Sequence, residues 1–197
     1  MFIACLAATE LAQAEEPEPV ALEYAPPGPR DPSAYNHDGF FLRMGLGFGP
    51  GWADDYNGLT ANVEFLLGGT LGSGFVLGAG LNTHTMLSPA DDVTALQLGS
   101  FALFATWYPD PRAGLNVQTL LGYGQLRLYA DQREQDIGDV VGLVLGGGVG
   151  YDLWVAKQWS LGPAARLTYG SLGDAQNGAE SHESWVSASL SLVATYH

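Results

Sequence analysis

The sequence has a single cysteine and few basic residues, and these two shortages exclude several classes of function. Cys5 is the only thiol, so the chain cannot form an internal disulfide. Lysine and arginine number 7 against 21 acidic residues, which gives a formal net charge of −14 at pH 7. Nucleic-acid binding depends on cationic contacts with phosphates, so no DNA or RNA partner is expected.

Long apolar runs are also missing, although 47% of the residues are hydrophobic. No stretch approaches the ~18–20 consecutive apolar residues that a transmembrane helix needs. Glycine, in contrast, is abundant, with 27 of 197 residues, well above an average share of about 7%. At this length the chain has room for one domain with a substantial core.

The N-terminus is predicted to be a signal peptide over residues 1–14. Residues 2–8 (FIACLAA) form a short apolar run, and residues 12–14 (AQA) have the small-x-small form of a signal peptidase site. No basic residue precedes the apolar run, so we expect its true start to be upstream or trimmed. The alternatives are an ordinary buried segment or a lipoprotein anchored at Cys5. Cleavage after Ala14 would leave the mature chain without a thiol.

Residues 15–38 are acidic and contain more than half of the 11 prolines. This composition predicts a disordered periplasmic lead-in. A tether that binds peptidoglycan or a partner is the alternative. The remaining residues, 39–197, are predicted to form one domain.

From Phe40 onward the apolar residues recur with a period of two, which is typical of strands. Eight strands are predicted, over residues 40–49, 59–68, 75–87, 94–108, 114–129, 140–155, 158–170 and 184–196. The fourth strand has no clear assignment of faces beyond Ser100. The fifth changes phase before Leu126, and we expect a β-bulge near Gly124 there.

The two faces of these strands differ strongly. One face carries large apolar side chains, such as Phe40, Met44 and Phe48 in the first strand. The other carries mostly glycine, serine, amides and an occasional charge. A soluble barrel or sandwich has bulky residues inside and polar residues outside, the reverse of what a lipid environment requires. Lipid tolerates a sheet only when it is closed, so the pattern predicts an all-β fold, an eight-stranded antiparallel transmembrane up-and-down β-barrel.

The lengths of the predicted connections support this fold. Those after strands one, three, five and seven (50–58, 88–93, 130–139, 171–183) are long and acidic, and the others are short. Long outer loops with short periplasmic turns are typical of outer-membrane barrels. An even strand number would place both termini in the periplasm. The acidic loops are expected to be a solvated surface, with weak divalent-cation binding as the alternative.

Aromatic residues gather near the predicted strand ends, where two girdles would lie at the lipid headgroups. The periplasmic girdle is predicted to contain Phe40, Tyr108, Tyr151, Trp159 and Tyr196. The outer girdle is predicted to contain Trp52, Tyr56, Tyr129, Tyr169 and Trp185.

The features that carry a family resemblance are the AQA end of the leader, the eight alternating strands and the last strand, SLSLVATYH. By these features, residues 40–197 resemble the small outer-membrane β-barrel superfamily of OmpA- and OmpX-type proteins. The resemblance implies insertion by the barrel-assembly machinery, which would recognise the C-terminal strand. Members usually end on phenylalanine, whereas Tyr196 here precedes His197. The resemblance also implies a location in the outer membrane of a Gram-negative bacterium, where outer-membrane lipid and lipopolysaccharide would surround the barrel. We expect the protein to be a monomer.

Few charged residues fall within the predicted strands. Arg43, Glu64, Asp152 and Arg166 share the parity of the lumen face, and Arg127 depends on the predicted bulge. If the first loop is symmetric, Arg43 and Glu64 become cross-strand neighbours. An eight-stranded barrel is only wide enough for its own side chains, so a charged network that plugs the lumen is expected. A proton or ion pathway is the alternative.

One pair of residues has the spacing of a catalytic motif. His182 and Ser184 lie two residues apart on the outer, lipid-facing side and resemble the His-x-Ser of outer-membrane lipid A deacylases. The family pattern expects asparagine after the serine and an acid further along, but Trp185 follows Ser184 and no acid follows Glu183. We therefore expect no enzyme, and no cofactor or metal site. His84 is expected to be a lumen filler.

The leading hypothesis is thus a non-enzymatic outer-membrane barrel with a structural or surface-interaction role. A narrow channel or small-solute transporter of the OmpW kind is the alternative, and a lipid-modifying enzyme of the deacylase kind comes third. Water-filled porins need about sixteen strands, so a wide porin is excluded.

Overall fold

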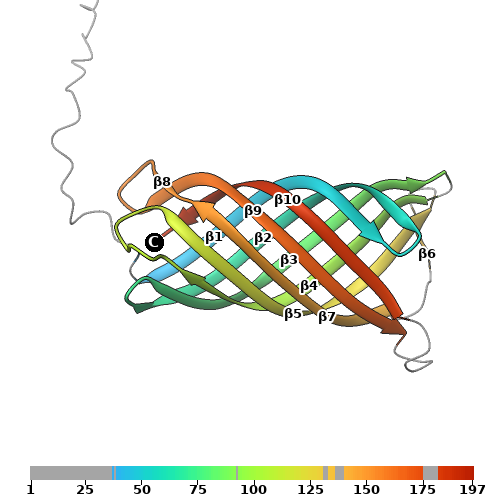
Figure 1. Ribbon diagram of the computed structural model, residues 1–197, viewed down its shortest axis with the longest axis horizontal. Helices are drawn as coiled ribbons and strands as arrows, with labels where there is room; N and C mark the ends of the chain where they lie inside the picture. The colour runs from blue at the N-terminus through green and yellow to red at the C-terminus, as the bar shows by residue number, and fades with distance from the viewer. Residues whose placement is uncertain (1–36, 38, 92, 131–132, 136–139, 175–181) are drawn as a thin grey trace, which may run out of the picture. The chain divides into compact units, whose positions relative to one another are not determined.

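The computed structural model describes residues 37, 39–91, 93–130, 133–135, 140–174 and 182–197. The predicted signal peptide and nearly all of the lead-in lie outside the described residues. Within the described part, the strands form a closed antiparallel barrel (Figure 1). No helix in this part is long and apolar enough to cross a membrane.

Eight long strands form the wall, and two short strands extend it. The long strands are β1 (Phe40–Ala53), β2 (Tyr56–Gly72), β3 (Phe75–Ala90), β4 (Val93–Trp107), β5 (Leu115–Ala130), β7 (Val140–Tyr151), β9 (Trp159–Asp174) and β10 (His182–Tyr196). The short strands are β6 (Arg133–Gln135), paired with β5, and β8 (Leu153–Trp154), paired with β9. Each long strand pairs with the next, and β10 pairs with β1 to close the barrel. The predicted all-β, eight-stranded up-and-down architecture is confirmed.

We call the end where β1 begins and β10 ends the proximal end, and the opposite end the distal end. At the distal end the strands are longer than expected. β1 and β2 stay paired to Ala53 and Tyr56, so the predicted loop 50–58 is a two-residue turn of Asp54 and Asp55. Asp54 has a positive φ of 43°, as a tight turn requires. The predicted loop 88–93 shrinks in the same way, so the prediction of long loops was wrong for these two connections.

The alternation of faces follows the sequence pattern. Large apolar side chains point outward and stay exposed, among them Leu46 at 66% and Leu190 at 69%. A bare protein leaves such a surface in water only at a high cost, since burying an aliphatic side chain is worth about 1.5–3 kcal/mol. The outer wall of the barrel is therefore built to meet an apolar medium.

The phase change predicted in the fifth strand has a different cause. β5 pairs with β4 and β7 without a register shift, so the expected bulge near Gly124 is absent from this described strand. Leu126 and Leu128 point inward and pack with the core, while Arg127 points outward and is exposed. The apolar residues switch faces here because the distal interior of the barrel is itself apolar.

The interior is packed rather than hollow. Buried apolar side chains, from Phe41 near the proximal end to Trp185 near the distal end, form one cluster beside the polar groups. Glycines let neighbouring strands approach closely in this narrow barrel. A Cβ at Gly162 would lie 1.8 Å from the backbone oxygen of Tyr151.

Candidate functional site

The lumen holds two buried ion pairs, and the first lies near the proximal end. An Arg43 Nη2 hydrogen donates to Asp152 Oδ2 at 2.8 Å, and the Tyr108 hydroxyl donates to the same oxygen at 2.7 Å. The Arg43 Nε hydrogen donates to Thr195 Oγ1 at 3.1 Å, and Nη1 donates to Asn116 Oδ1 at 3.3 Å. Arg43 and Asp152 are each 1% exposed. Hydrogen bonds from several strands thus offset part of the cost of desolvating both charges.

The second ion pair lies in the middle of the barrel. Arg166 on β9 approaches Glu64 on β2 at 2.5 Å, and it also hydrogen bonds Asn82 and Gln118. Gly45 makes the room for the carboxylate, because a Cβ there would lie 2.8 Å from Glu64 Oε1.

All four predicted lumen charges therefore lie inside the barrel, but the predicted Arg43–Glu64 pair was wrong. Arg43 faces Leu66 across the strands, and Glu64 faces Gly45. The hairpin is centred on the Asp54–Asp55 turn, which moves the register by two residues from the symmetric loop that was assumed. A shift of two keeps every side chain on its face and changes only its partner.

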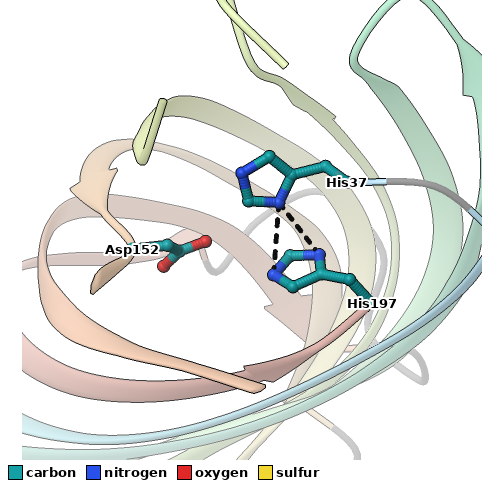
Figure 2. A group of neighbouring side chains, drawn as sticks. All are labelled: His37, Asp152 and His197. Carbon is teal, nitrogen blue, oxygen red and sulfur yellow. Dashed lines mark hydrogen bonds between the residues drawn. The ribbon is translucent and has the colours of Figure 1, made fainter. Parts of the chain in front are cut away.

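Two histidines close the proximal mouth, and sequence reasoning missed both. His37 stacks on Tyr108 with ring centroids 3.7 Å apart and meets His197 edge-on at 4.2 Å. Figure 2 shows the two imidazoles joined by hydrogen bonds between their ring nitrogens, with the Asp152 carboxylate beside them. Burial lowers the pKa of both histidines, so both rings are neutral at pH 7. His37 and His197 lie outside the strand pattern and 160 residues apart, so no sequence periodicity could reveal them.

Near the distal end, His84 is a buried lumen residue, as expected. It contacts Ser187 Oγ at 3.3 Å, and the same oxygen accepts the Trp185 indole N–H at 3.1 Å. Trp185 is fully buried and does not belong to an outer girdle, so that prediction was wrong. The residue precedes Val186 and therefore has the inward parity of β10.

The aromatic residues at the proximal end divide between the two faces. Tyr108 was assigned to the girdle, but it is fully buried in the lumen. Phe40, Tyr151, Trp159 and Tyr196 lie on the outer face, where Trp159 and Tyr196 have ring centroids 5.4 Å apart. Sequence reasoning missed Phe75 and Trp107, which stack on this face with centroids 6.0 Å apart.

The distal aromatic residues also divide between the two faces. Trp52 and Tyr169 point outward and are 48% and 46% exposed, and Tyr129 also lies on the outer face. Tyr56 packs against the interior cluster instead, so its assignment to the outer girdle was wrong. Tyr56 is the first residue of β2 and has the inward parity of that strand, whereas the sequence pattern placed it in the predicted loop 50–58.

The distal turn joins β10 through Ser184. Its hydroxyl donates to Asp54 Oδ1 at 2.8 Å, and its backbone N–H donates to Oδ2 at 3.1 Å. Glu183, at the rim of β10 beyond the apolar belt, also hydrogen bonds Asp54; this bond lowers the pKa of Asp54 and raises that of Glu183 to about 7. The side chain of His182 lies outside the described residues. Ser184 thus donates its hydroxyl hydrogen to the carboxylate of Asp54 rather than to a histidine, unlike the serine of a hydrolytic triad.

No model of a known family matches the sequence, and no curated protein matches it. Among solved structures, Neisserial surface protein A is similar with a TM-score of 0.61 at 12% identity, covering 80% of this chain and 96% of that one. This chain shares its barrel fold. OprG from Pseudomonas aeruginosa gives 0.48 at 11% identity, covering 83% and 97%. Ail of Yersinia pestis, in complex with the heparin analogue sucrose octasulfate, gives 0.49 at 12% identity, covering 81% and 98%.

Proposed function

We propose that this protein is a non-enzymatic barrel of the outer membrane of a Gram-negative bacterium, with a closed lumen and a structural or surface-interaction role. The outward apolar residues and the closed hydrogen-bonded ladder support a membrane location. A sheet without a free edge satisfies its backbone groups internally, which lipid requires. The fold shared with Neisserial surface protein A is consistent with this location.

The packed lumen is the observation that carries the proposal. Arg43, Glu64 and Asp152 are 1–2% exposed and Arg166 is 8% exposed, and each has a partner from another strand. Buried apolar side chains fill the interior beside them. A conducting pore would keep its charged groups hydrated, whereas these are desolvated and paired. The barrel therefore acts as a rigid body that displays its distal rim.

The distal rim supplies the surface for interactions. The described acids there include Asp54, Asp55, Asp91 and Glu183. On this proposal the proximal end, with the start of β1 and the end of β10, faces the periplasm. The barrel-assembly machinery would recognise β10, and lipopolysaccharide would surround the distal half of the wall.

Conductance tests the closed lumen. The purified protein in planar lipid bilayers is expected to give no current steps, and Glu64→Gln is expected to lower thermal stability without raising conductance. The double variant Arg43→Ala/Arg166→Ala removes the two cationic side chains from the lumen. It serves as the control that shows whether the assay can detect current through a less filled barrel. Reproducible current steps from the wild type would replace the closed barrel with a channel.

Surface labelling tests the orientation. In a Cys5→Ser background, Asp55→Cys places a thiol on the distal turn and Lys157→Cys places one on an exposed proximal turn. A membrane-impermeant maleimide is expected to label Asp55→Cys on intact cells and Lys157→Cys only after permeabilisation. The reverse pattern contradicts the proposed orientation.

A further inference from the structure

Three potential metal ligands from distant parts of the chain meet at the proximal mouth. His37 precedes β1, Asp152 lies between β7 and β8, and His197 follows β10. One ligand atom from each lies within 4.8 Å of the other two (Figure 2). All three residues are buried, with exposures of 1%, 1% and 7%.

The hydrogen bonds of His37 aim one ring nitrogen at this cluster. Its Nε2 lies 3.1 Å from the backbone oxygen of Ala113, which can only accept, so Nε2 carries the hydrogen. In the neutral ring, Nδ1 then carries a lone pair and faces His197 at 3.0 Å. Metal-bound histidines are typically oriented in this way, by donating the other N–H to a carbonyl or carboxylate.

The spacing of the histidine nitrogens suits a shared ion. His37 Nδ1 lies 3.0 Å from Nδ1 and 3.2 Å from Nε2 of His197. Two nitrogens each about 2.0–2.1 Å from a metal are about 2.9–3.4 Å apart as neighbouring ligands. Either nitrogen of His197 therefore fits, and Nε2 also has Ser160 Oγ at 3.1 Å.

Asp152 supplies an independent sign of a ligand. Its Oδ2 accepts from Arg43 and Tyr108, but its buried Oδ1 has no hydrogen-bond partner among the described residues. A buried carboxylate oxygen without a partner is costly, and a bound cation would compensate that cost. To complete the site, the carboxylate must move by up to about 1.5 Å.

We infer that His37, Asp152 and His197 form a binding site for one divalent transition-metal ion of the Zn²⁺ class. Two imidazoles and one carboxylate favour this class over Ca²⁺ or Mg²⁺, which prefer oxygen ligands. Three protein ligands leave one position for water. The nearby Arg43 guanidinium opposes a cation, so we expect weaker binding than at a closed four-ligand zinc site. The inference does not depend on the proposed function, because it concerns only the proximal mouth.

Co²⁺ is the probe, because its visible absorption reports nitrogen and oxygen ligands directly. The full chain, folded in detergent micelles, is titrated with Co²⁺ and then with competing Zn²⁺. The wild type is expected to bind one equivalent, and Zn²⁺ is expected to remove the signal and raise the melting temperature until EDTA is added. No Co²⁺ signal, or binding of Ca²⁺ in its place, overturns the inference.

The four histidines of the chain give matched variants. His37→Gln and His197→Gln are expected to weaken Co²⁺ binding at least tenfold, whereas His84→Gln and His182→Gln retain it. Equal binding by all four variants overturns the site. Circular dichroism checks that each variant folds. If His197→Gln does not fold, His37→Gln decides, since His37 lies before the first strand and its loss removes no strand pairing.

Discussion

Arg43 and Asp152 are 109 residues apart in the sequence, yet Arg43 Nη2 donates a hydrogen bond to Asp152 Oδ2 inside the barrel, with the two atoms 2.8 Å apart. The pair joins β1 to the residue that follows β7, and these two strands are not neighbours in the barrel. Its side chains are 1% and 0% exposed. A barrel whose strands were paired in another register would separate these two side chains. The contact therefore forms only when the strands pair in the observed register.

Removing one partner of this pair is expected to be strongly destabilising. Arg43→Met leaves Asp152 buried without its cation, and Asp152→Asn leaves Arg43 without its anion. Each change is expected to lower the free energy of unfolding by about 3–5 kcal/mol, the usual range for one lost partner of a buried pair. Urea unfolding in detergent micelles measures this. The double variant Arg43→Met/Asp152→Asn should lose less than the two single losses combined, and simple additivity contradicts the coupling.

The sequence predicted the wall of the barrel well but its partners poorly. The period-two pattern placed Arg43, Glu64, Asp152 and Arg166 in the lumen, because parity alone decides the face. Which of these charges pair depends on the register of the hairpin. The end of β1 and the start of β2 contain enough turn-forming residues to be interpreted as a loop. The turn-like residues around Asp54 concealed the last four residue pairs of that hairpin, from Pro50–Leu59 to Ala53–Tyr56.

The site at the proximal mouth could not be predicted in the same way. His37 lies in a proline-rich segment without periodicity, and His197 follows the last strand. Asp152 was recognised only as a lumen charge. The three meet because a closed barrel brings the start of β1, the end of β7 and the end of β10 to one rim, and that proximity appears only after closure.

Glycines on the two faces should differ sharply in their tolerance to alanine. A Cβ at Gly162, on the inward face of β9, would meet the Tyr151 backbone oxygen at 1.8 Å, whereas the nearest atom to a Cβ at Gly147 is 4.0 Å away. Because the obstacle is backbone, Gly162→Ala is expected to cost at least about 1–3 kcal/mol or to block folding. Gly147→Ala, on the outward face of β7, is expected to fold normally. Comparison of thermal melting checks this, and equal stability contradicts the close strand packing.

An arginine on the outer wall tests whether lipid covers it. Leu190 is near the middle of β10 and 69% exposed, while Ser171 is exposed toward the distal end of β9. Leu190→Arg is expected to destabilise the protein by about 2–4 kcal/mol in lipid vesicles, and Ser171→Arg by about 0–1 kcal/mol, because the cost depends on depth in the bilayer. Leu190→Ala separates the loss of leucine from the gain of charge. If Leu190→Arg costs no more than Ser171→Arg, then the wall is not buried in lipid.

The contact between the distal turn and β10 should weaken as the pH rises. The hydrogen bond with Asp54 raises the pKa of Glu183 to about 7 from 4.5, so the folded state keeps this proton to a higher pH than the unfolded state. The stabilisation that protonated Glu183 gives to this contact is therefore full below pH 4.5 and is lost as the pH rises through about 7. Asp54, whose pKa is lowered from 3.8, stays charged throughout this window. Amide exchange of the Ser184 N–H, which donates to Asp54, reports the contact. Relative to Glu183→Gln, which keeps a neutral side chain at every pH, the wild type is expected to lose protection between pH 5 and 8. A constant ratio across this range shows that Glu183 does not hold the turn by a shared proton.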